Sequence, residues 1–509
     1  MKVVSAADMQ YIEEKAYQEG FCPEDLMDRA ALGVASFIRR YIFKNKLSNA
    51  VNVFCGKGNN GGDAYEVARL LLEGGYNIRV FQLFAEENKA SRLLEKKRKA
   101  FIDCSGEVID LKDTSQIELL EGGLILDGIL GTGFRGEAEG FLAEVIEYIN
   151  RQHEVVISLD IPSGLNGSSG RASIKTVRAD ITLYLGFPKQ GFYIRDGWDY
   201  IGQVRGVDLC LEDRYLEGVK ISLEVIEKDV MRDLLPVMKA SSHKYTRGYV
   251  VGMAGSSGMM GAAFLAGKAA LHTGAGIVRV LYPDNARAEV GQKPWELLAT
   301  SYGDSLAEHC KKASSFFIGP GIGQSRESKD VLYDILAFNE KPLVLDADAL
   351  NIISKCDDIN IPEGSIMTPH FGEMMRLLGR PDDRPEIDLN FLRECYRYSE
   401  KKKVVLILKG GPSYIFIPGD KIYVNGQGNS GMSTAGSGDV LTGVLAALLA
   451  QGLSSEKAAL LGVYLHSIAG DIASVKHTSY SMVASHIINC LEDAFKSLAY
   501  PLKGSHSLF

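Results

Sequence analysis

Short apolar runs alternate with amphipathic stretches through most of the chain, and this alternation constrains the fold more than any other feature. In the first half, residues 63–72 have the pattern of a helix, and strands are predicted at 51–54, 78–84, 124–127, 155–160 and 181–185. A second series of predicted strands occupies 249–252, 277–281, 316–319, 342–346, 364–368 and 404–409. Strands that alternate with helices predict parallel sheets covered on both faces. The sequence therefore predicts an α/β protein.

The chain is 509 residues long, which is more than one ordinary core contains. The alternating pattern dissolves between about residues 208 and 239, so we place a domain boundary near 215–225. A parallel sheet binds ligands beyond the carboxyl ends of its strands. The functional residues are therefore expected directly after the predicted strands.

Charge and cysteine usage exclude several classes of function. The formal net charge is −8, and the densest basic run, residues 96–99, has the pattern of a solvated helix face, so we expect no nucleic-acid partner. The eight cysteines have no zinc-site spacing and indicate free thiols in a reducing cytoplasm. No signal pattern follows Met1, and the longest apolar stretch, around 440–450, is too short for a membrane span. We therefore predict a cytoplasmic protein without a membrane partner.

Two glycine-rich loops follow predicted strands in the first half. Gly56–Gly61 and Gly131–Gly136 both match the pattern G-x-G-x-x-G. A dinucleotide-binding dehydrogenase also needs an acidic residue at the end of the next strand, and the predicted strand 78–84 ends without one. Simple connecting turns are one alternative. Two such loops at strand ends favour one shared anion-binding site.

Oxygen-bearing side chains gather after the same strands. They are Asn59, Asn60, Asp63, Asp127, Asp160 and Ser163. Parallel strands would bring these groups together, and amide, carboxylate and hydroxyl oxygens suit a hard cation. The alternative for Asp160 and Ser163 is that they only cap a turn.

Four segments carry a family resemblance. Gly58–Asp63, Asp127–Gly133, Asp160–Gly164 and Phe187–Gly191 resemble the NAD(P)H-hydrate epimerase domain over residues 1–215. That family has a Rossmann-like three-layer fold, interconverts the R and S forms of hydrated NADH and NADPH, and uses a bound potassium ion. One departure is Ala64, which stands where the family usually has glycine.

The resemblance assigns roles to residues of this chain. It implies that Asn60, Asp127 and Ser163 hold potassium and that Asp160 is an acid or base of the epimerisation. It implies that the substrate lies along Asn59, Asn60, Gly61, Gly62, Asp63, Gly131, Thr132, Gly133, Phe134, Arg135, Gly136, Glu137 and Asp160. For Lys189, phosphate binding and an ordinary surface position both stay open.

The second half contains a glycine-rich segment, Gly428–Asp439, followed by an apolar helix. Small residues before a helix leave backbone N–H groups free, and the helix dipole adds positive potential, which together form an anion hole for a phosphate. Asp439 beside this hole could take the proton from an attacking hydroxyl, or it could simply cap the helix. The spacing is not that of a Walker A loop.

Further strand ends agree with phosphate chemistry. Lys409–Ser413 could hold nucleotide phosphates, and His370 beside a proline turn favours a substrate contact. Asp346 and Asp348 could bind Mg²⁺ through water or support the sheet, with neither preferred.

Together with Ala254–Ala262, these motifs resemble the NAD(P)H-hydrate dehydratase domain of the ribokinase-like superfamily, which we assign to residues 223–500. That family dehydrates the S-hydrate with ADP, or ATP in eukaryotes, and Mg²⁺; we expect ADP here. The resemblance implies that the hydrate contacts Ala262, Gly321, Gly323, His370 and Asp439. It implies that the nucleotide contacts Lys409, Gly410, Gly411, Pro412, Ser413 and Gly438.

The two resemblances together predict a bifunctional enzyme that repairs hydrated NADH and NADPH, called NADHX and NADPHX, and that forms a homo-oligomer. One alternative is a ribokinase-type small-molecule kinase fused to a non-catalytic Rossmann-like binding domain. Another is a binding scaffold, because first-half domains of this type also occur in non-catalytic RNA-decapping proteins. The oxygen-bearing set of Asn60, Asp127 and Ser163 and the acidic charge argue against a scaffold.

Overall fold

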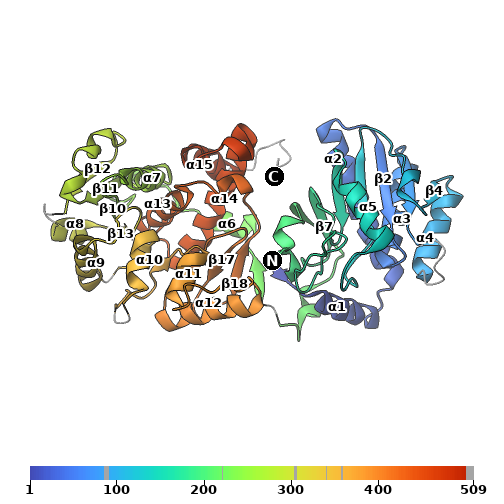
Figure 1. Ribbon diagram of the computed structural model, residues 1–509, viewed down its shortest axis with the longest axis horizontal. Coiled ribbons are helices and arrows are strands. Elements are labelled where there is room, and N and C mark those ends of the chain that lie inside the picture. The colour runs from blue at the N-terminus through green and yellow to red at the C-terminus, as the bar shows by residue number, and fades with distance from the viewer. Residues whose placement is uncertain (85–90, 221, 303–305, 340, 357–358, 500–509) are drawn as a thin grey trace. The chain divides into compact units, whose positions relative to one another are not determined.

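The protein is described from a computed structural model that covers residues 1–499, apart from 85–90, 221, 303–305, 340 and 357–358. The chain divides into two compact units, Lys2–Leu223 and a second that begins at Glu224 and includes Met1. Figure 1 shows strands and helices in both units. Each unit is described by itself.

The first unit is built on a seven-stranded parallel sheet with the order β4-β3-β2-β5-β6-β7-β8. Its strands are β2 (Ala50–Cys55), β3 (Asn77–Gln82), β4 (Glu107–Asp110), β5 (Leu124–Gly128), β6 (Val155–Leu159), β7 (Ile181–Leu185) and β8 (Gln203–Val207). The five predicted strands are all present. The two edge strands, β4 and β8, were not predicted, because their residues are partly exposed and lack a continuous apolar run.

The helices of the first unit cover this sheet. They are α1 (Ala6–Gln18), which follows the short strand β1 (Lys2–Val3), α2 (Pro23–Asn45), α3 (Asn59–Glu73), α4 (Arg92–Asp103) and α5 (Gly140–Asn150). The predicted helix start at Asp63 is wrong, because α3 already begins at Asn59. Glycine disfavours a helix interior, yet Gly61 is required here, since a Cβ on it would lie 2.3 Å from the carbonyl oxygen of Gly56.

The basic run on α4 is not wholly a solvated face. Lys97 is 5% exposed and forms ion pairs with Asp28 and, at 3.4 Å, with Glu66. Lys96 and Lys99 remain exposed.

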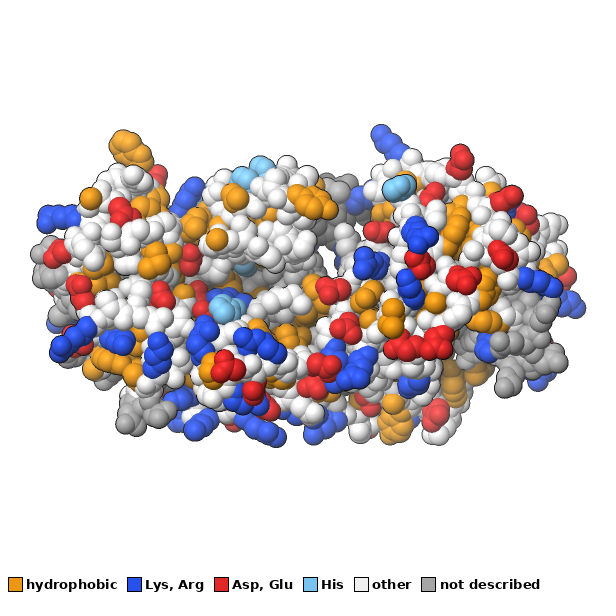
Figure 2. Space-filling view, in the orientation of Figure 1, with side chains coloured by type: hydrophobic (Ala, Val, Ile, Leu, Met, Phe, Trp, Pro, Cys, Tyr) orange, Lys and Arg blue, Asp and Glu red, His pale blue; other side chains and the backbone are white. Residues whose placement is uncertain are grey.

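On the face shown in Figure 2, acidic and basic side chains are interspersed rather than gathered into a field of one sign.

The second unit contains a larger, mixed sheet. From β12 to β16 its order is β12-β11-β10-β13-β14-β15-β16, all parallel, and the antiparallel strands β17 and β18 follow, with β9 beside β18. The strands are β9 (Leu223–Val225), β10 (Tyr249–Met253), β11 (Ile277–Tyr282), β12 (Leu298–Ser301), β13 (Ser315–Ile318), β14 (Leu343–Leu345), β15 (Ile366–Met367), β16 (Val405–Leu408), β17 (Ser413–Phe416) and β18 (Ile422–Asn425). The six predicted strands are present, whereas β9, β12, β17 and β18 were not predicted.

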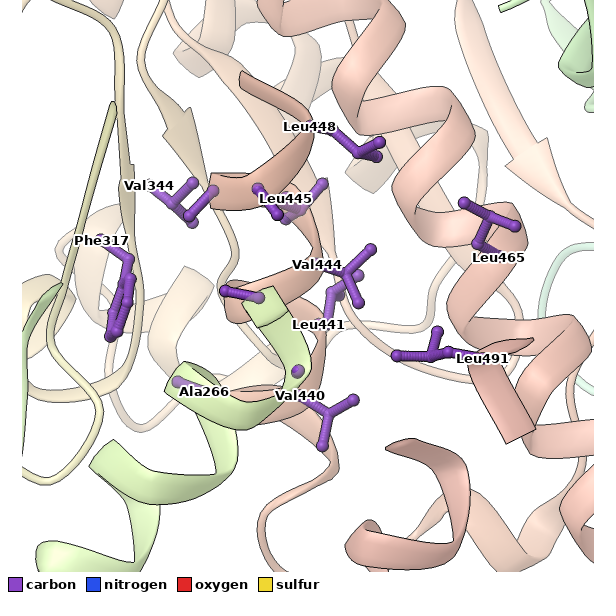
Figure 3. Close-up of a cluster of buried hydrophobic side chains, with 14 of the residues drawn as sticks. Ala266, Phe317, Val344, Val440, Leu441, Val444, Leu445, Leu448, Leu465 and Leu491 are labelled. Atoms are coloured by element: carbon purple, nitrogen blue, oxygen red, sulfur yellow. The ribbon is translucent and has the colours of Figure 1, made fainter. Parts of the chain in front are cut away.

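Four helices of the second unit pack together on one face of this sheet. They are α7 (Met260–His272), α13 (Ser437–Ala450), α14 (Ser455–Ser481) and α15 (Ala484–Ala499). Figure 3 shows side chains of α13 such as Val440 and Leu445 between Ala266 of α7, Phe317 of β13 and Leu465 of α14. Helix α12 (Leu389–Lys402) packs against β16 and β17. The remaining helices are α6 (Lys228–Asp233), α8 (Leu306–Lys312), α9 (Arg326–Phe338), α10 (Ala347–Ile353) and α11 (Phe371–Leu377).

Among the described helices, α14 alone is long and apolar enough to cross a membrane by length and composition. It is also longer than the stretch around 440–450, so the prediction that this stretch is the longest apolar one is wrong. In the structure, 78% of the apolar window of α14 is buried inside the protein. This burial is that of a core helix, and α14 packs against α13 and α15.

Two candidate active sites at strand ends

The first unit has a cavity of about 630 Å³ beyond the carboxyl ends of its central strands. Both predicted glycine-rich loops contribute to it, together with α1 and α2. Of the residues named from the sequence, the cavity is lined by Asn59, Asn60, Asp63, Gly131, Thr132, Gly133, Phe134, Arg135, Asp160 and Lys189. The predicted convergence of strand-end groups therefore occurs around one cavity, as expected for a parallel sheet.

Four of the predicted substrate residues do not line the cavity. Gly61 and Gly62 lie inside α3, where they permit close packing, and Gly136 is also outside the lining. Glu137 turns away, because its carboxylate accepts hydrogen bonds of 2.9 Å from the hydroxyl of Ser173 and the N–H of Ile174. Direct substrate contacts are thus expected from residues 131–135 rather than from Gly136 and Glu137.

The departure at Ala64 does not narrow this cavity. Ala64 is fully buried and is absent from the lining. The Cβ of Ala64 packs against Gly128 of β5, because a Cβ added to Gly128 would lie 2.5 Å from the Ala64 Cβ. The neighbouring Tyr65 is buried too and donates a hydrogen bond of 2.8 Å to Gln82. The substitution therefore affects packing between α3 and the sheet rather than the site.

Asp127, Ser163 and Asn60 lie together at the ends of β5, β6 and the start of α3. Asp127 is fully buried and accepts hydrogen bonds from the Ser163 hydroxyl at 2.5 Å, the Ser163 N–H at 2.9 Å and the Ser158 hydroxyl at 2.8 Å. The Asn60 amide donates to the carbonyl oxygen of Leu130 at 2.7 Å. Burial raises the pKa of Asp127, and the hydrogen bonds from Ser163 oppose the rise.

The chemistry of this group fits a monovalent cation. Within the described part of the chain, no lysine, arginine or histidine pairs with the buried Asp127 carboxylate. One carboxylate with neutral amide, hydroxyl and carbonyl oxygens matches a single positive charge and is a donor set for a hard cation. Among the described residues, no group of three or more His, Cys, Asp or Glu side chains is placed to hold one metal ion.

Asp160 forms a buried ion pair with Lys189 at the floor of the cavity. The Lys189 ammonium donates to the Asp160 carboxylate at 2.5 Å and to the carbonyl oxygen of Leu185 at 2.9 Å, and Lys189 is fully buried. The surface position considered for Lys189 is therefore wrong. Asp160 adopts a left-handed backbone conformation with φ of 63°, which is uncommon outside glycine and often marks a functional site.

Two further carboxyl groups line the same cavity. Asp63 projects from α3, and burial raises its pKa well above the usual range, with the charges of Asp160 and Glu13 adding to the rise. Glu13 comes from α1; burial raises its pKa to about 7, Lys189 acts to lower it and Asp160 adds to the rise. Glu13 was not predicted from the sequence, because α1 carries none of the strand-end motifs.

The second candidate site surrounds the start of α13. Gly436 has a left-handed φ of 89°, and the helix begins at Ser437. The segment from Gly428 to Ser437 is held at both ends by residues of α14. Asp471 accepts a hydrogen bond of 3.1 Å from the N–H of Gly428, and the His466 ring lies 3.0 Å from the carbonyl oxygen of Ser437. The loop is therefore anchored at both ends, which leaves its N–H groups preorganised for an anion.

Asp439 lies in the first turn of α13 beside a buried polar network. Asp346 is 1% exposed and accepts hydrogen bonds from Lys409 at 2.6 Å and Thr442 at 2.7 Å. Burial acts to lower the pKa of Lys409, but the carboxylates of Asp346 and Glu373 outweigh it and raise that pKa. Burial raises the pKa of Asp439 to about 7; Asp346 adds to the rise and Lys409 opposes it.

The ends of β14, β15 and β16 bring the other predicted residues to this edge. His370 follows β15 and pairs with Lys409 after β16 in a parallel bridge. Its Nδ1 accepts hydrogen bonds from the N–H groups of Gly372 at 3.0 Å and Glu373 at 3.3 Å, which caps α11. In a neutral ring, Nε2 therefore carries the hydrogen, and it lies 3.4 Å from a carboxylate oxygen of Glu373. Burial lowers the pKa of His370, and Glu373 opposes this.

The glycine loops of the second unit approach the same edge. Gly321 lies against α7, since a Cβ on it would be 3.1 Å from the Cβ of Ala262. Asp348 accepts a hydrogen bond of 2.9 Å from the N–H of Gly323. Asp346 and Asp348 are thus both hydrogen-bonded by the protein, which agrees with support of the sheet, and Mg²⁺ binding through water stays a prediction.

Residues 409–413, which the sequence predicts to contact the nucleotide, form the turn between β16 and β17. The Ser413 hydroxyl donates to the carbonyl oxygen of Gly410 at 3.1 Å, and the Gly411–Pro412 peptide bond is cis. Gly438 of α13 lies beside Lys409, because a Cβ added to Gly438 would be 3.2 Å from the Lys409 ammonium nitrogen. Lys409 and the start of α13 therefore face one another.

These features define a class of protein, a two-unit α/β enzyme with a site at a parallel strand edge in each unit. In the second unit, an anion hole, a buried lysine and a carboxyl group converge, as phosphoryl transfer to a hydroxyl requires.

Comparison with known proteins identifies the family. Residues 250–493 match the family model of NAD(P)H-hydrate dehydratase, and residues 23–191 match that of the YjeF-related protein N-terminus. A bifunctional NAD(P)H-hydrate repair enzyme from Moorella thermoacetica is 34% identical over 98% of this chain and 97% of the relative. The enzymes of that name from Thermofilum pendens (31%, over 98% of this chain and 97% of the relative) and Escherichia coli (33%, over 86% and 84%) are also similar. The chain belongs to the family of bifunctional NAD(P)H-hydrate repair enzymes.

A solved structure agrees with the fold of the second unit. A ribokinase-like superfamily protein from Enterococcus faecalis V583 is 26% identical, with a TM-score of 0.50, and covers 55% of this chain and 97% of its own. The ribokinase-like fold predicted for the second half is thereby confirmed.

Proposed function

We propose that the chain repairs hydrated NADH and NADPH in two steps. The first unit interconverts the R and S epimers, and the second unit dehydrates the S epimer at the expense of ADP, releasing AMP and phosphate. The observation that carries the proposal is the convergence of Asp439, Lys409 and the anion-hole loop in a chain that also holds a carboxyl-lined cavity.

In the dehydration, the substrate hydroxyl on C6 of the nicotinamide ring attacks the terminal phosphate of ADP. Asp439 takes the hydroxyl proton, a new O–P bond forms and AMP leaves. The ammonium of Lys409 and the N–H groups at the start of α13 stabilise the charge on the transferring phosphoryl group. The ring nitrogen then drives out phosphate from C6, and loss of a C5 proton forms the C5–C6 double bond of the dihydropyridine.

The raised pKa of Asp439 suits this role. A carboxyl group whose pKa is about 7 can accept a proton during the reaction and release it afterwards at neutral pH. Mg²⁺ would supply neutralisation of the phosphate charge, held mainly by the phosphates themselves, since both carboxylates after β14 are engaged by the protein.

In the epimerisation, Asp160 is the proposed acid or base and Lys189 holds its carboxylate in place. Asn60, Asp127 and Ser163 would hold potassium, which would supply a positive charge beside the cavity. The loop 131–135 would bind and orient the substrate.

The test uses the full chain with hydrated NADH, ADP and Mg²⁺, followed by the absorbance of the dihydropyridine band. We expect ADP-dependent formation of NADH, and epimer interconversion without nucleotide that slows when potassium is removed. Replacing ADP by ATP in a parallel reaction decides the nucleotide. Phosphorylation of a vitamin or sugar hydroxyl without NADH formation would instead support the kinase alternative.

A further inference from the structure

The N-terminal segment is fastened to the part of the chain that carries Lys189. The N–H of Val4 donates to the carbonyl oxygen of Pro188 at 3.0 Å, and the N–H of Gln190 donates to the carbonyl oxygen of Val4 at 2.7 Å. The hydroxyl of Ser5 then caps α1 by accepting a hydrogen bond of 3.0 Å from the N–H of Asp8. The start of α1 is therefore set directly beside the lysine of the cavity.

One face of α1 completes the cavity wall. Ile12 and Ala16 are fully buried and lock the rotation of the helix. Gln10, Glu13 and Tyr17 are spaced three and four residues apart, which places them on one face, and all three line the cavity. A glutamate on a short helix is usually solvated, as the exposed neighbour Glu14 is. Glu13 instead points its carboxyl group into the cavity.

Carboxyl groups outnumber fully buried cations among the residues that line the cavity. Asp160, Asp63 and Glu13 contribute three carboxyl groups against the buried ammonium of Lys189, which pairs with Asp160. Lys57 and Arg135 also line the cavity, and Lys57 lies over the ring of Phe84.

Within the described residues, neither Asp63 nor Glu13 has a hydrogen-bond or ion-pair partner, although Asp63 is only 9% exposed. Unpaired carboxyl groups in such a place tend to hold a proton near neutral pH. The cavity therefore contains both an ionised carboxylate and carboxyl groups able to give a proton.

We propose that Glu13 is a second catalytic acid–base residue of the epimerisation, acting with Asp160, an inference that rests on the proposed function of the first unit. Protonated Glu13 gives its proton to the C6 hydroxyl of the hydrate. The C6–O bond breaks, water leaves, and the ring-nitrogen electron pair forms an N1–C6 double bond. Water then adds to the other face of C6 as a carboxylate takes its proton, and the electron pair returns to nitrogen.

Inversion at C6 explains why two carboxyl groups are needed. The hydroxyl leaves from one face of the ring and water enters from the other, so proton transfer is required on both faces. Glu13 reaches the cavity from α1 and Asp160 from the end of β6, two different elements of the wall. In the reverse direction the two groups exchange roles, as a reversible epimerisation demands.

The test measures epimer interconversion by the full chain, starting from the pure S-hydrate of NADH without nucleotide. Glu13→Gln is expected to slow it by about 10²-fold or more, because general acid–base catalysis contributes about 10²–10⁴-fold. Glu14→Gln, one residue further on the same helix, is the matched control and should keep the wild-type rate. The ADP-dependent dehydration of both variants should also stay at the wild-type rate, which shows that the second unit is folded, and the first unit of both variants should melt at the wild-type temperature, which shows that it is folded as well.

Two further readouts separate catalysis from packing. Glu13→Asp keeps a carboxyl group and should restore part of the rate, whereas a purely structural glutamate would be replaced equally well by glutamine. The wild-type rate should also show a pH dependence near 7 that Glu13→Gln lacks. A wild-type rate in Glu13→Gln overturns the inference, while a wild-type chain that does not interconvert the epimers at all overturns the proposed function instead.

Discussion

Replacing Asp439 by asparagine should make the protein more stable and almost inactive in dehydration. The burial that raises the pKa of Asp439 from 3.8 to about 7 also means that ionising this carboxyl group costs the folded state free energy. At about 1.4 kcal/mol per pKa unit, the full shift corresponds to roughly 4 kcal/mol. Solvent reaches part of the side chain, so we expect a smaller effect of about 1–2 kcal/mol.

The pH dependence of this effect has a definite sign. At pH 3 the carboxyl group is protonated in both the folded and the unfolded chain, so Asp439 contributes no difference. As the pH rises from about 4 to 7, the unfolded chain ionises first, and the wild type loses stability relative to Asp439→Asn. Above pH 7 the advantage of the variant is constant. For a unit of this size it corresponds to a melting temperature higher by about 2–6 °C.

The assay follows the melting transition that ADP shifts, because a nucleotide stabilises only the unit that binds it. Wild type and Asp439→Asn are compared at pH 5 and pH 8, with Asp382→Asn, a change at an exposed acidic residue, as the control. Dehydration by Asp439→Asn should fall by about 10²–10⁴-fold, or about 3–5 kcal/mol in the barrier, with epimerisation intact. A variant no more stable than wild type at pH 8, or one that keeps dehydration, would refute the reasoning.

Three other substitutions test features of the two units. Lys409→Met leaves Asp346 buried without its cation and should lower the free energy of unfolding by about 3–5 kcal/mol, measured in urea. Burial lowers the pKa of His466 from 6.5 to about 4, so the wild type should lose stability as the pH falls from 6.5 towards 4. The urea midpoint of the variant His466→Gln should change less over that pH range. Gly61→Ala places a Cβ 2.3 Å from a backbone carbonyl oxygen and should lower the melting temperature of the first unit and its epimerisation, whereas Gly133→Ala meets no atom within 4 Å and should melt as wild type.

The central strands could be predicted because they are buried on both faces and read as continuous apolar runs. β2 is buried at all six positions, and β5 at all five. The edge strand β4 begins and ends with exposed Glu107 and Asp110, so no apolar run marks it. The hairpin of β17 and β18 was not predicted for another reason: Pro412 and the glycines before it indicate a loop, but they do not indicate that a strand begins directly after it.

The same distinction applies to the sites. The segment around Asp439 could be predicted because loop, helix start and acid are contiguous in the sequence. Glu13 is separated from Asp160 by well over a hundred residues, and tertiary contacts such as the pairing of Val4 with the segment around Lys189 bring them together. The motif at Phe187–Gly191 named Lys189, but its burial and its ion pair with Asp160 depend on tertiary contacts that no local pattern contains.

The attachment of α1 beside Lys189 has a consequence for how the limits of this domain are drawn. The matching segment of the family model begins at residue 23, five residues after α1 ends at Gln18. A protein expressed from that point would keep every strand of the parallel sheet and both glycine-rich loops. It would nevertheless lose one wall of the cavity and the Glu13 carboxyl group. Limits taken from sequence similarity would then remove a wall of the site together with Ile12 and Ala16 of the hydrophobic core, and inactivity of such a fragment would say nothing about the intact enzyme.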